Sequence, residues 1–392
     1  MKTIGLATLT EIYNYGTKLQ AYAMQEIFMS RGYDTEIIRF ADRQNLISTL
    51  KYRIKDVLRS VAPRWMQHRQ ESIYLSKQYE NLPNGSLVSV LKSRLKALNA
   101  MDSKYKIKTY VTRSEMIDGS RKYSAVVCGS DQIWKPSAKR LKIWTLQYIH
   151  KDVRRFSYAP SIGYGSIPED KVSFYRKVIK EFYAVSVREV SAANILSSLS
   201  DKKISVVLDP TLLVGRNVWD KVLKEKAGLT NRSYCLCYLL GTTPEHRKMC
   251  SEFAKRQSLE LYNFTHFKKY NDADEQLEGE HLYDVDPAEF VGLVSKARFI
   301  VTDSFHCSCF AMMYHIPFAT LLRYQSSDSE STNSRIFSLL GQFGMEGRIC
   351  QSMDDIDKII ASSIDYPVVD RILESKRTES NAFVDNALKG LK

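Results

Sequence analysis

Short apolar runs that each end in a turn of small and polar residues constrain the fold of this chain more than any other feature. Residues 125–128 end in Gly129-Ser130-Asp131, and residues 298–301 end in Thr302-Asp303-Ser304. Similar runs occur at residues 3–7, 35–39, 156–159, 184–187, 206–208, 234–239, 258–263 and 318–322. Helix-like segments separate many of these runs. Buried strands alternating with helices are typical of α/β proteins with doubly wound parallel sheets.

The chain has 392 residues, which suits two domains better than one. The strand-helix pattern restarts shortly after residue 210. We therefore predict two similar α/β domains facing each other across a cleft, over residues 1–210 and 217–365. The remaining residues, 366–392, contain a predicted helix that crosses back to the first domain.

Positive charge is concentrated in one part of the chain. The net charge is +13, and residues 41–122 hold 17 Lys and Arg against 7 Asp and Glu, a net charge of +10. We interpret this region as a basic, largely helical insertion in the first domain. No nucleic-acid-binding motif accompanies the charge, so we do not expect nucleic acid as a partner.

Residues 50–65 predict an amphipathic helix within this insertion. One face carries the apolar side chains Ile54, Val57, Leu58, Val61 and Trp65. Basic residues occupy the other faces, namely Lys51, Arg53, Lys55 and Arg59. Such a helix suits the surface of an anionic membrane, and it suits equally a helix packed on the protein with a solvated basic face.

The composition indicates a soluble protein without a spanning helix. Hydrophobic residues make up 44% of the chain and charged residues 26%, and no apolar run reaches the roughly 18 residues that a bilayer requires. The N-terminus enters a strand directly, without a signal-peptide pattern, so we expect a cytoplasmic protein that touches a membrane only peripherally. The seven scattered cysteines fit reduced thiols.

The strongest single candidate for function is His306, at the turn between a predicted strand and a predicted helix. Ser304 precedes it, and free backbone N–H groups at a helix start favour an anion. Cys307 and Cys309 could suggest metal ligation, but no second cluster of ligands exists in the sequence. We therefore interpret these two cysteines as core residues and predict no metal.

Several motifs, taken in order, resemble those of the polysaccharide pyruvyl transferase family. They run from about residue 4 to residue 348, and each is weak alone. The motifs are Asn14-Tyr15-Gly16, Gly129-Ser130-Asp131-Gln132-Ile133-Trp134, residues 157–163, residues 185–189, residues 208–213, Ser304-Phe305-His306 and Asn333-Ser334-Arg335-Ile336. Two positions depart from the family pattern: Cys307 replaces a residue that is often Gly, and Lys135 replaces an Asn.

The resemblance implies a GT-B-like fold and the transfer of a pyruvyl group from phosphoenolpyruvate to two hydroxyls of a sugar, forming a cyclic ketal. The acceptor would belong to a capsule or other surface polysaccharide or its lipid-linked precursor, and no cofactor would be needed. A GT-B glycosyltransferase that uses a nucleotide sugar is the alternative. A non-catalytic carbohydrate-binding relative is a third possibility, although this chain keeps His306.

The resemblance also implies that Arg188, His306 and Arg323 contact the donor. Arginines suit the carboxylate and phosphate of phosphoenolpyruvate, and we add Arg335 together with Ser304 and Ser334. His306 is the candidate general acid, or else a phosphate ligand in its imidazolium form.

Four residues are candidates for the acceptor side. Asp131 could accept a proton from the acceptor hydroxyl, or it could simply cap a turn. Trp134 is either a platform for a sugar ring or a core residue. Asn14 and Tyr15 could line the acceptor cleft or only shape the turn before a helix.

Overall fold

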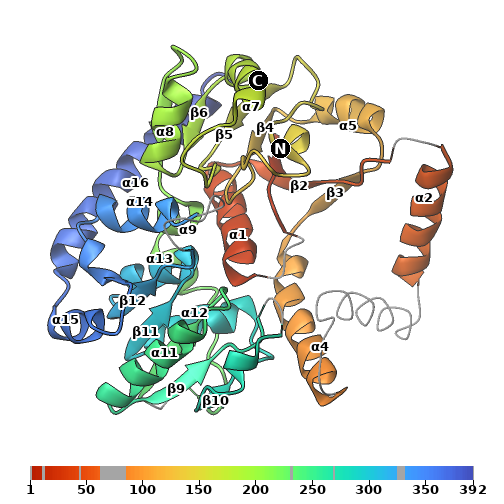
Figure 1. Ribbon diagram of the computed structural model, residues 1–392. Helices are drawn as coiled ribbons and strands as arrows, with labels where there is room; N and C mark the ends of the chain where they lie inside the picture. The colour runs from red at the N-terminus through yellow and green to blue at the C-terminus, as the bar shows by residue number, and fades with distance from the viewer. Residues whose placement is uncertain are drawn as a thin grey trace.

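The computed structural model describes residues 2–10, 14–43, 46–61, 85–229, 233–267, 270–324 and 332–391. Two parallel sheets form its framework, with helices on their faces and α1 between them (Figure 1). The first sheet has the strand order β3-β2-β1-β4-β5, and the second has the order β10-β9-β8-β11-β12-β13. Every strand pair in both sheets is parallel. The predicted α/β class with two Rossmann-like halves is confirmed.

The first half is built from the strands and helices that precede residue 210. Its strands are β1 (Thr3–Ala7), β2 (Asp34–Phe40), β3 (Ile107–Tyr110), β4 (Ala125–Cys128), β5 (Arg154–Ser157), β6 (Val185–Val187) and β7 (Ile204–Val206). Its helices are α1 (Tyr15–Met29), α2 (Leu46–Val61), α4 (Gly85–Asn99), α5 (Arg113–Gly119), α6 (Leu141–Trp144), α7 (Glu169–Glu181) and α8 (Val190–Ser197).

Two short helices lead into the second half, α9 (Pro210–Leu213) and α10 (Arg216–Trp219). The strands that follow are β8 (Tyr234–Tyr238), β9 (Glu260–Asn263), β10 (Glu280–His281), β11 (Phe299–Thr302), β12 (Phe318–Leu321) and β13 (Ile349–Cys350). The helices are α11 (Pro244–Arg256), α12 (Pro287–Lys296), α13 (Phe305–Met313), α14 (Ser334–Gln342), α15 (Asp355–Ala361) and α16 (Tyr366–Leu388). Short 3₁₀ turns cover residues 100–104, 120–122, 272–274 and 346–348.

Strand β3 is the main difference from the sequence-based expectation. It lies inside the basic region, which we predicted as a largely helical insertion, and it forms the edge of the first sheet beside β2. Its sequence alternates Ile107-Lys108-Thr109-Tyr110, and only Tyr110 is buried. An edge strand with one face exposed to solvent has no continuous apolar run, so a search for buried strands does not find β3.

Helix α16 returns from the second half to the first (Figure 1). Its Ser380 hydroxyl accepts a hydrogen bond from the backbone N–H of Leu208 at 2.9 Å. Near its end, Asp385 pairs with Arg31 at 2.7 Å, and the carbonyl of Ala387 accepts from Arg154 at 3.0 Å. These contacts tie the end of the chain to the first sheet and its helices.

Tyr15, the first residue of α1, is buried in the second half of the molecule. Its ring is fully buried and stacks on Phe290 with a centroid separation of 4.5 Å. Its hydroxyl donates to the carbonyl of Val285 at 2.9 Å. Tyr238 and Phe264 meet the same ring edge-on. Buried aromatic rings with satisfied hydroxyls contribute strongly to packing, so this contact joins the two halves.

No helix in the described part of the chain combines the length and the apolar character needed to cross a bilayer.

Candidate active site

The carboxyl ends of strands from both sheets meet around Asp209, which lies in the segment that links the two halves. Its Oδ2 accepts hydrogen bonds from Nη1 of Arg188 at 2.7 Å and from the hydroxyl of Ser130 at 3.1 Å. Its Oδ1 accepts from the backbone N–H and the hydroxyl of Thr211 at 3.0 and 2.7 Å, which caps α9. Both carboxylate oxygens are therefore satisfied inside the protein.

Charge around Asp209 favours its ionised form. Burial alone raises the pKa of this carboxyl, but the nearby His306 and Arg188 together hold that pKa well below its usual range. Asp209 stands in a motif that we associated with the family, yet we assigned it no role. The signal was present in the sequence, because a buried strand followed by Asp and Pro places a carboxylate at a helix start.

Arg188 follows β6 and is almost completely buried. Its Nε donates to Glu189 at 3.2 Å, and its guanidinium lies 4.0 Å from the centre of the Phe305 ring. Its third nitrogen, Nη2, is buried with no hydrogen-bond partner among the described residues. Buried donors in native proteins are rarely unpaired, so this nitrogen has an unused capacity for a hydrogen bond.

His306 lies in the first turn of α13, with Ser304 as the N-cap whose hydroxyl accepts from the backbone of Cys307 at 3.5 Å. Its Nε2 lies 3.5 Å from Oδ2 of Asp209 but makes no hydrogen bond of acceptable geometry. We therefore describe the His306–Asp209 contact as electrostatic. The other ring nitrogen, Nδ1, lies against Gly16 at the start of α1.

Asp131 follows β4 and faces the same group of charges. Its Oδ2 accepts from the hydroxyl of Thr17 at 2.8 Å, and its Oδ1 accepts from the backbone N–H of Gln132 at 2.8 Å. Burial raises the pKa of this carboxyl, but His306 and Arg188 outweigh that effect and lower the pKa. Asp131 thus caps its own turn and also lies within the electrostatic reach of His306.

Arg335 is a buried guanidinium without an ion-pair partner in the part of the chain that the structure describes. It donates from Nε to the carbonyl of Thr332 at 3.1 Å and from Nη2 to the Thr332 hydroxyl at 2.8 Å. The side-chain oxygen of Gln132, in its favourable amide orientation, accepts from Nη1 at 2.9 Å. Burial, together with Arg188 and Arg323, lowers the pKa of Arg335 to about 10.

Arg323 differs from Arg335, because its guanidinium is paired with the carboxylate of Asp303. Nη2 donates to Oδ1 at 3.1 Å and to the backbone carbonyl of Asp303 at 2.9 Å, while Nε donates to Oδ2 at 3.3 Å. The Asp303 carboxylate also accepts from the backbone of Leu240 and Gly241. The positive charge of Arg323 is one of the causes that lower the pKa of Arg335. Direct contact between Arg323 and a donor stays a prediction.

The acceptor-side candidates divide into two groups. Tyr15 and Trp134 are fully buried, and Nε1 of Trp134 donates to the carbonyl of Trp144 at 3.1 Å. Neither ring offers surface to a sugar in this conformation, so the structure favours core packing for both. Asn14 is half-buried and caps α1 by accepting from the backbone of Thr17 at 3.4 Å. Ser334, a candidate for the donor side, begins α14 and is also half-buried.

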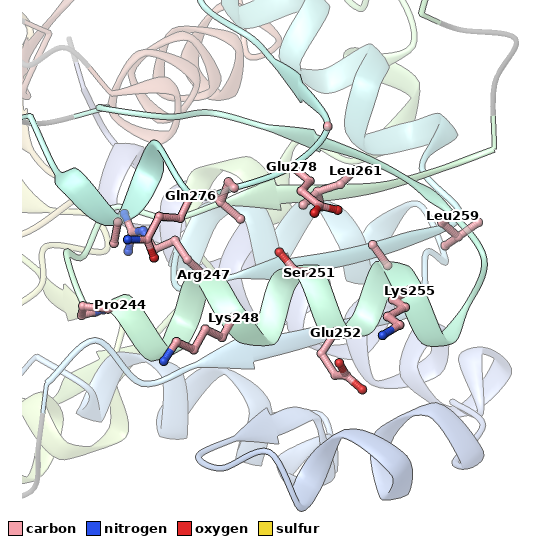
Figure 2. Close-up of a pocket in the computed structure, with 14 residues that line it drawn as sticks. Pro244, Arg247, Lys248, Ser251, Glu252, Lys255, Leu259, Leu261, Gln276 and Glu278 are labelled. Carbon is pink, nitrogen blue, oxygen red and sulfur yellow. The ribbon is translucent and has the colours of Figure 1, made fainter.

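The cysteines are buried, as the core interpretation requires. Across the described residues, no group of His, Cys, Asp and Glu side chains could hold a metal ion. A separate cavity of about 730 Å³ lies between α11 and residues 273–279 (Figure 2), and it shares no lining residue with the site around Asp209. Its charged lining residues are Arg247, Lys248 and Lys255 together with Glu252 and Glu278.

Two Rossmann-like halves with a polar site at the strand ends where they meet define a GT-B-type protein. The family model for polysaccharide pyruvyl transferase matches residues 14–326. The chain belongs to this family.

Solved structures support the same fold. UDP-GlcNAc 2-epimerase from Neisseria meningitidis, bound to UDP-GlcNAc, aligns over 99% of this chain and 99% of its own with a TM-score of 0.52 and 12% identity. S. aureus MnaA in complex with UDP aligns over 98% of this chain and 92% of its own, with a TM-score of 0.51 and 12% identity. A search of curated proteins gave no significant match. At such low identity, the two structural relatives show the fold alone.

Proposed function

We propose that this protein transfers a pyruvyl group from phosphoenolpyruvate to two hydroxyls of one sugar, forming a cyclic ketal and releasing phosphate. The observation that carries the proposal is a pair of buried guanidinium groups with incomplete pairing. Nη2 of Arg188 has no partner among the described residues, and Arg335 has no carboxylate there. A small anion with several oxygens would satisfy both, and phosphoenolpyruvate carries a carboxylate and a phosphate.

Proton transfer to the methylene carbon of phosphoenolpyruvate starts the reaction that we propose. His306, as an imidazolium, donates the proton, which converts the methylene to a methyl group and makes the central carbon electrophilic. The first sugar hydroxyl adds to that carbon and gives its proton to Asp131. The second hydroxyl then displaces phosphate, which closes the ketal ring and releases one further proton.

Two carboxylates lie near the His306 imidazole. Asp209 lies 3.5 Å from Nε2, and Asp131 acts on the ring through space. Because Nδ1 packs against Gly16 and Nε2 has no hydrogen-bond partner among the described residues, Nε2 is the nitrogen to which we assign proton delivery.

Incubation with phosphoenolpyruvate and a synthetic galactoside tests the proposal. We expect release of phosphate together with a mass gain on the sugar, and loss of both in Arg188→Ala and His306→Ala proteins that remain folded. Hydrolysis of a nucleotide sugar without any ketal product on a series of hexosides would overturn the proposal and favour the glycosyltransferase alternative.

We further propose that the natural acceptor is a lipid-linked precursor of a surface polysaccharide. The family name implies a polysaccharide, and the basic region at residues 41–122 would suit an acceptor held at an anionic membrane. A comparison of turnover on a soluble hexoside with turnover on the same sugar attached to a polyprenyl diphosphate tests this. Equal kcat/KM for the two acceptors would argue against it.

A further inference from the structure

Helix α2 exposes an apolar row to solvent. The side chains of Ile47, Leu50 and Ile54 are 68%, 58% and 52% exposed. Spacings of three and four residues place them along one stripe of the helix. Figure 1 shows α2 at the periphery of the molecule, on the side of β3 and α4. A helix on a soluble protein normally turns such a stripe toward the core, so this orientation points to an external partner.

Positive charge borders the row on both sides. At about 100° per residue, Lys51 lies about 40° from Ile47, and Arg53 lies about 60° from Leu50 on the opposite side. Lys51 is exposed, and the Arg53 side chain is 59% exposed even though it pairs with Glu115. The sequence of α2 contains four basic residues and a single acidic one, Asp56.

The apolar row and its basic borders together distinguish between the possible partners of α2. A second copy of the chain would bring two basic borders together, and like charges repel. A nucleic acid would pair with the cations but would leave the apolar row in water. An anionic lipid surface satisfies both features, because the apolar side chains enter the acyl boundary while Lys and Arg remain at the headgroups.

We propose that α2 is a membrane-docking helix that lies in the interface of an anionic bilayer. Ile47, Leu50 and Ile54 would insert, and Lys51 and Arg53 would contact lipid phosphates. The purpose of this docking rests on the proposed function, since it would hold the active site beside a lipid-linked acceptor. The docking itself requires no pyruvyl transfer.

Vesicle co-sedimentation of the full chain tests the proposal in the absence of phosphoenolpyruvate and sugar. We expect binding to vesicles of equal parts phosphatidylcholine and phosphatidylglycerol, and little binding to pure phosphatidylcholine. The triple variant Ile47→Ser, Leu50→Ser, Ile54→Ser should bind the anionic vesicles at least about ten-fold more weakly than the wild type. Lys51→Glu should weaken binding too, and added salt should weaken the wild type.

A matched control removes exposed apolar surface elsewhere. Met29 and Met353 are 52% and 40% exposed and lie on other parts of the molecule. The double variant Met29→Ser, Met353→Ser should bind vesicles like the wild type. Phosphate release with a soluble galactoside, measured without vesicles, should be equal in all these proteins, which separates docking from the transfer reaction.

Three outcomes would overturn the docking proposal. One is equal binding of the wild type and the triple variant to anionic vesicles. Another is a change from dimer to monomer in the triple variant, which would make the row an interface between copies. The third is retention of RNA by the wild type with no vesicle binding at all.

Discussion

The imidazole of His306 lies directly against the Cα atom of Gly16, so that a Cβ atom at position 16 would lie 2.2 Å from Nδ1. The two residues belong to different halves of the molecule. Gly16 lies inside the first turn of α1, and its backbone is not in the left-handed region. Gly16 belongs to the Asn14-Tyr15-Gly16 motif, and its lack of a side chain allows the close approach of the imidazole.

Gly16→Ala therefore tests whether that approach is required for activity. Alanine favours a helix by about 1 kcal/mol over glycine, yet its methyl group would displace the His306 ring. We expect kcat/KM to fall about 100-fold while the protein remains folded. Gly347→Ala is the control, because a Cβ there meets nothing within 4 Å. Wild-type kinetics in Gly16→Ala would show that the ring can move without loss.

Asp209→Asn tests the carboxylate at the centre of the site. Asparagine keeps the shape and the contact with Thr211 but removes the charge that faces Arg188 and His306. We expect a loss of about 3 kcal/mol in the free energy of unfolding, because the buried Arg188 guanidinium loses one of its two carboxylate partners. Urea titration measures this. We also expect kcat to fall about 100-fold in protein that is still folded.

A matched variant separates the two effects of Asp209→Asn. Asp303→Asn removes another buried carboxylate that pairs with an arginine, and it leaves the contact between Asp209 and His306 intact. It should cost similar stability while changing the KM for phosphoenolpyruvate more than kcat. An identical fall in kcat for both variants would argue that Asp209 acts only through stability.

Donor binding should weaken in alkali because of Arg335. Burial and the neighbouring arginines lower its pKa to about 10, so the guanidinium is charged at neutral pH and loses its charge as the pH rises through that value. Calorimetry with phosphoenolpyruvate at about pH 8 and about pH 10.5 should show weaker binding at the higher pH. Arg335→Gln should bind weakly at both, with a flatter pH dependence. The same pH dependence in that variant would assign the effect to another group.

Tyr15→Phe separates a core role from an acceptor role for Tyr15. The change keeps the ring stacked on Phe290 and removes the hydrogen bond to the buried carbonyl of Val285. We expect the free energy of unfolding to fall by about 1–2 kcal/mol, with the KM for the sugar unchanged. Tyr183→Phe, at a residue that is 54% exposed, should change neither quantity. A raised sugar KM in Tyr15→Phe alone would restore the acceptor role.

Much of the framework could be predicted from the sequence, because parallel strands are buried on both faces. Runs such as β4 and β11 contain only apolar residues or end in one polar residue, and polar turns mark where they stop. The same logic places Asp131, Arg188 and His306 at strand ends, and the structure brings these three together. The pairing of β3 at the edge of the first sheet and the burial of Tyr15 in the second half depend on tertiary packing, so no local pattern indicates them.

The amphipathic helix shows the limit of periodicity. The pattern predicted a helix over residues 50–65, and the structure has α2 at Leu46–Val61, while Trp65 lies outside the described residues. Periodicity finds the apolar face but does not say what covers it. Only the exposure of Ile47, Leu50 and Ile54 in the structure distinguishes a helix packed on the protein from one that faces outward.

The anchoring of Tyr15 in the second half has a mechanical consequence. If the halves rotate apart to admit a polysaccharide, either Tyr15 leaves its aromatic pocket or the start of α1 is pulled along with the second half. Both movements displace Gly16 and Thr17, which touch His306 and Asp131. The proposed acid and base would then be aligned only in the closed molecule, so proton transfer would require the two halves to close.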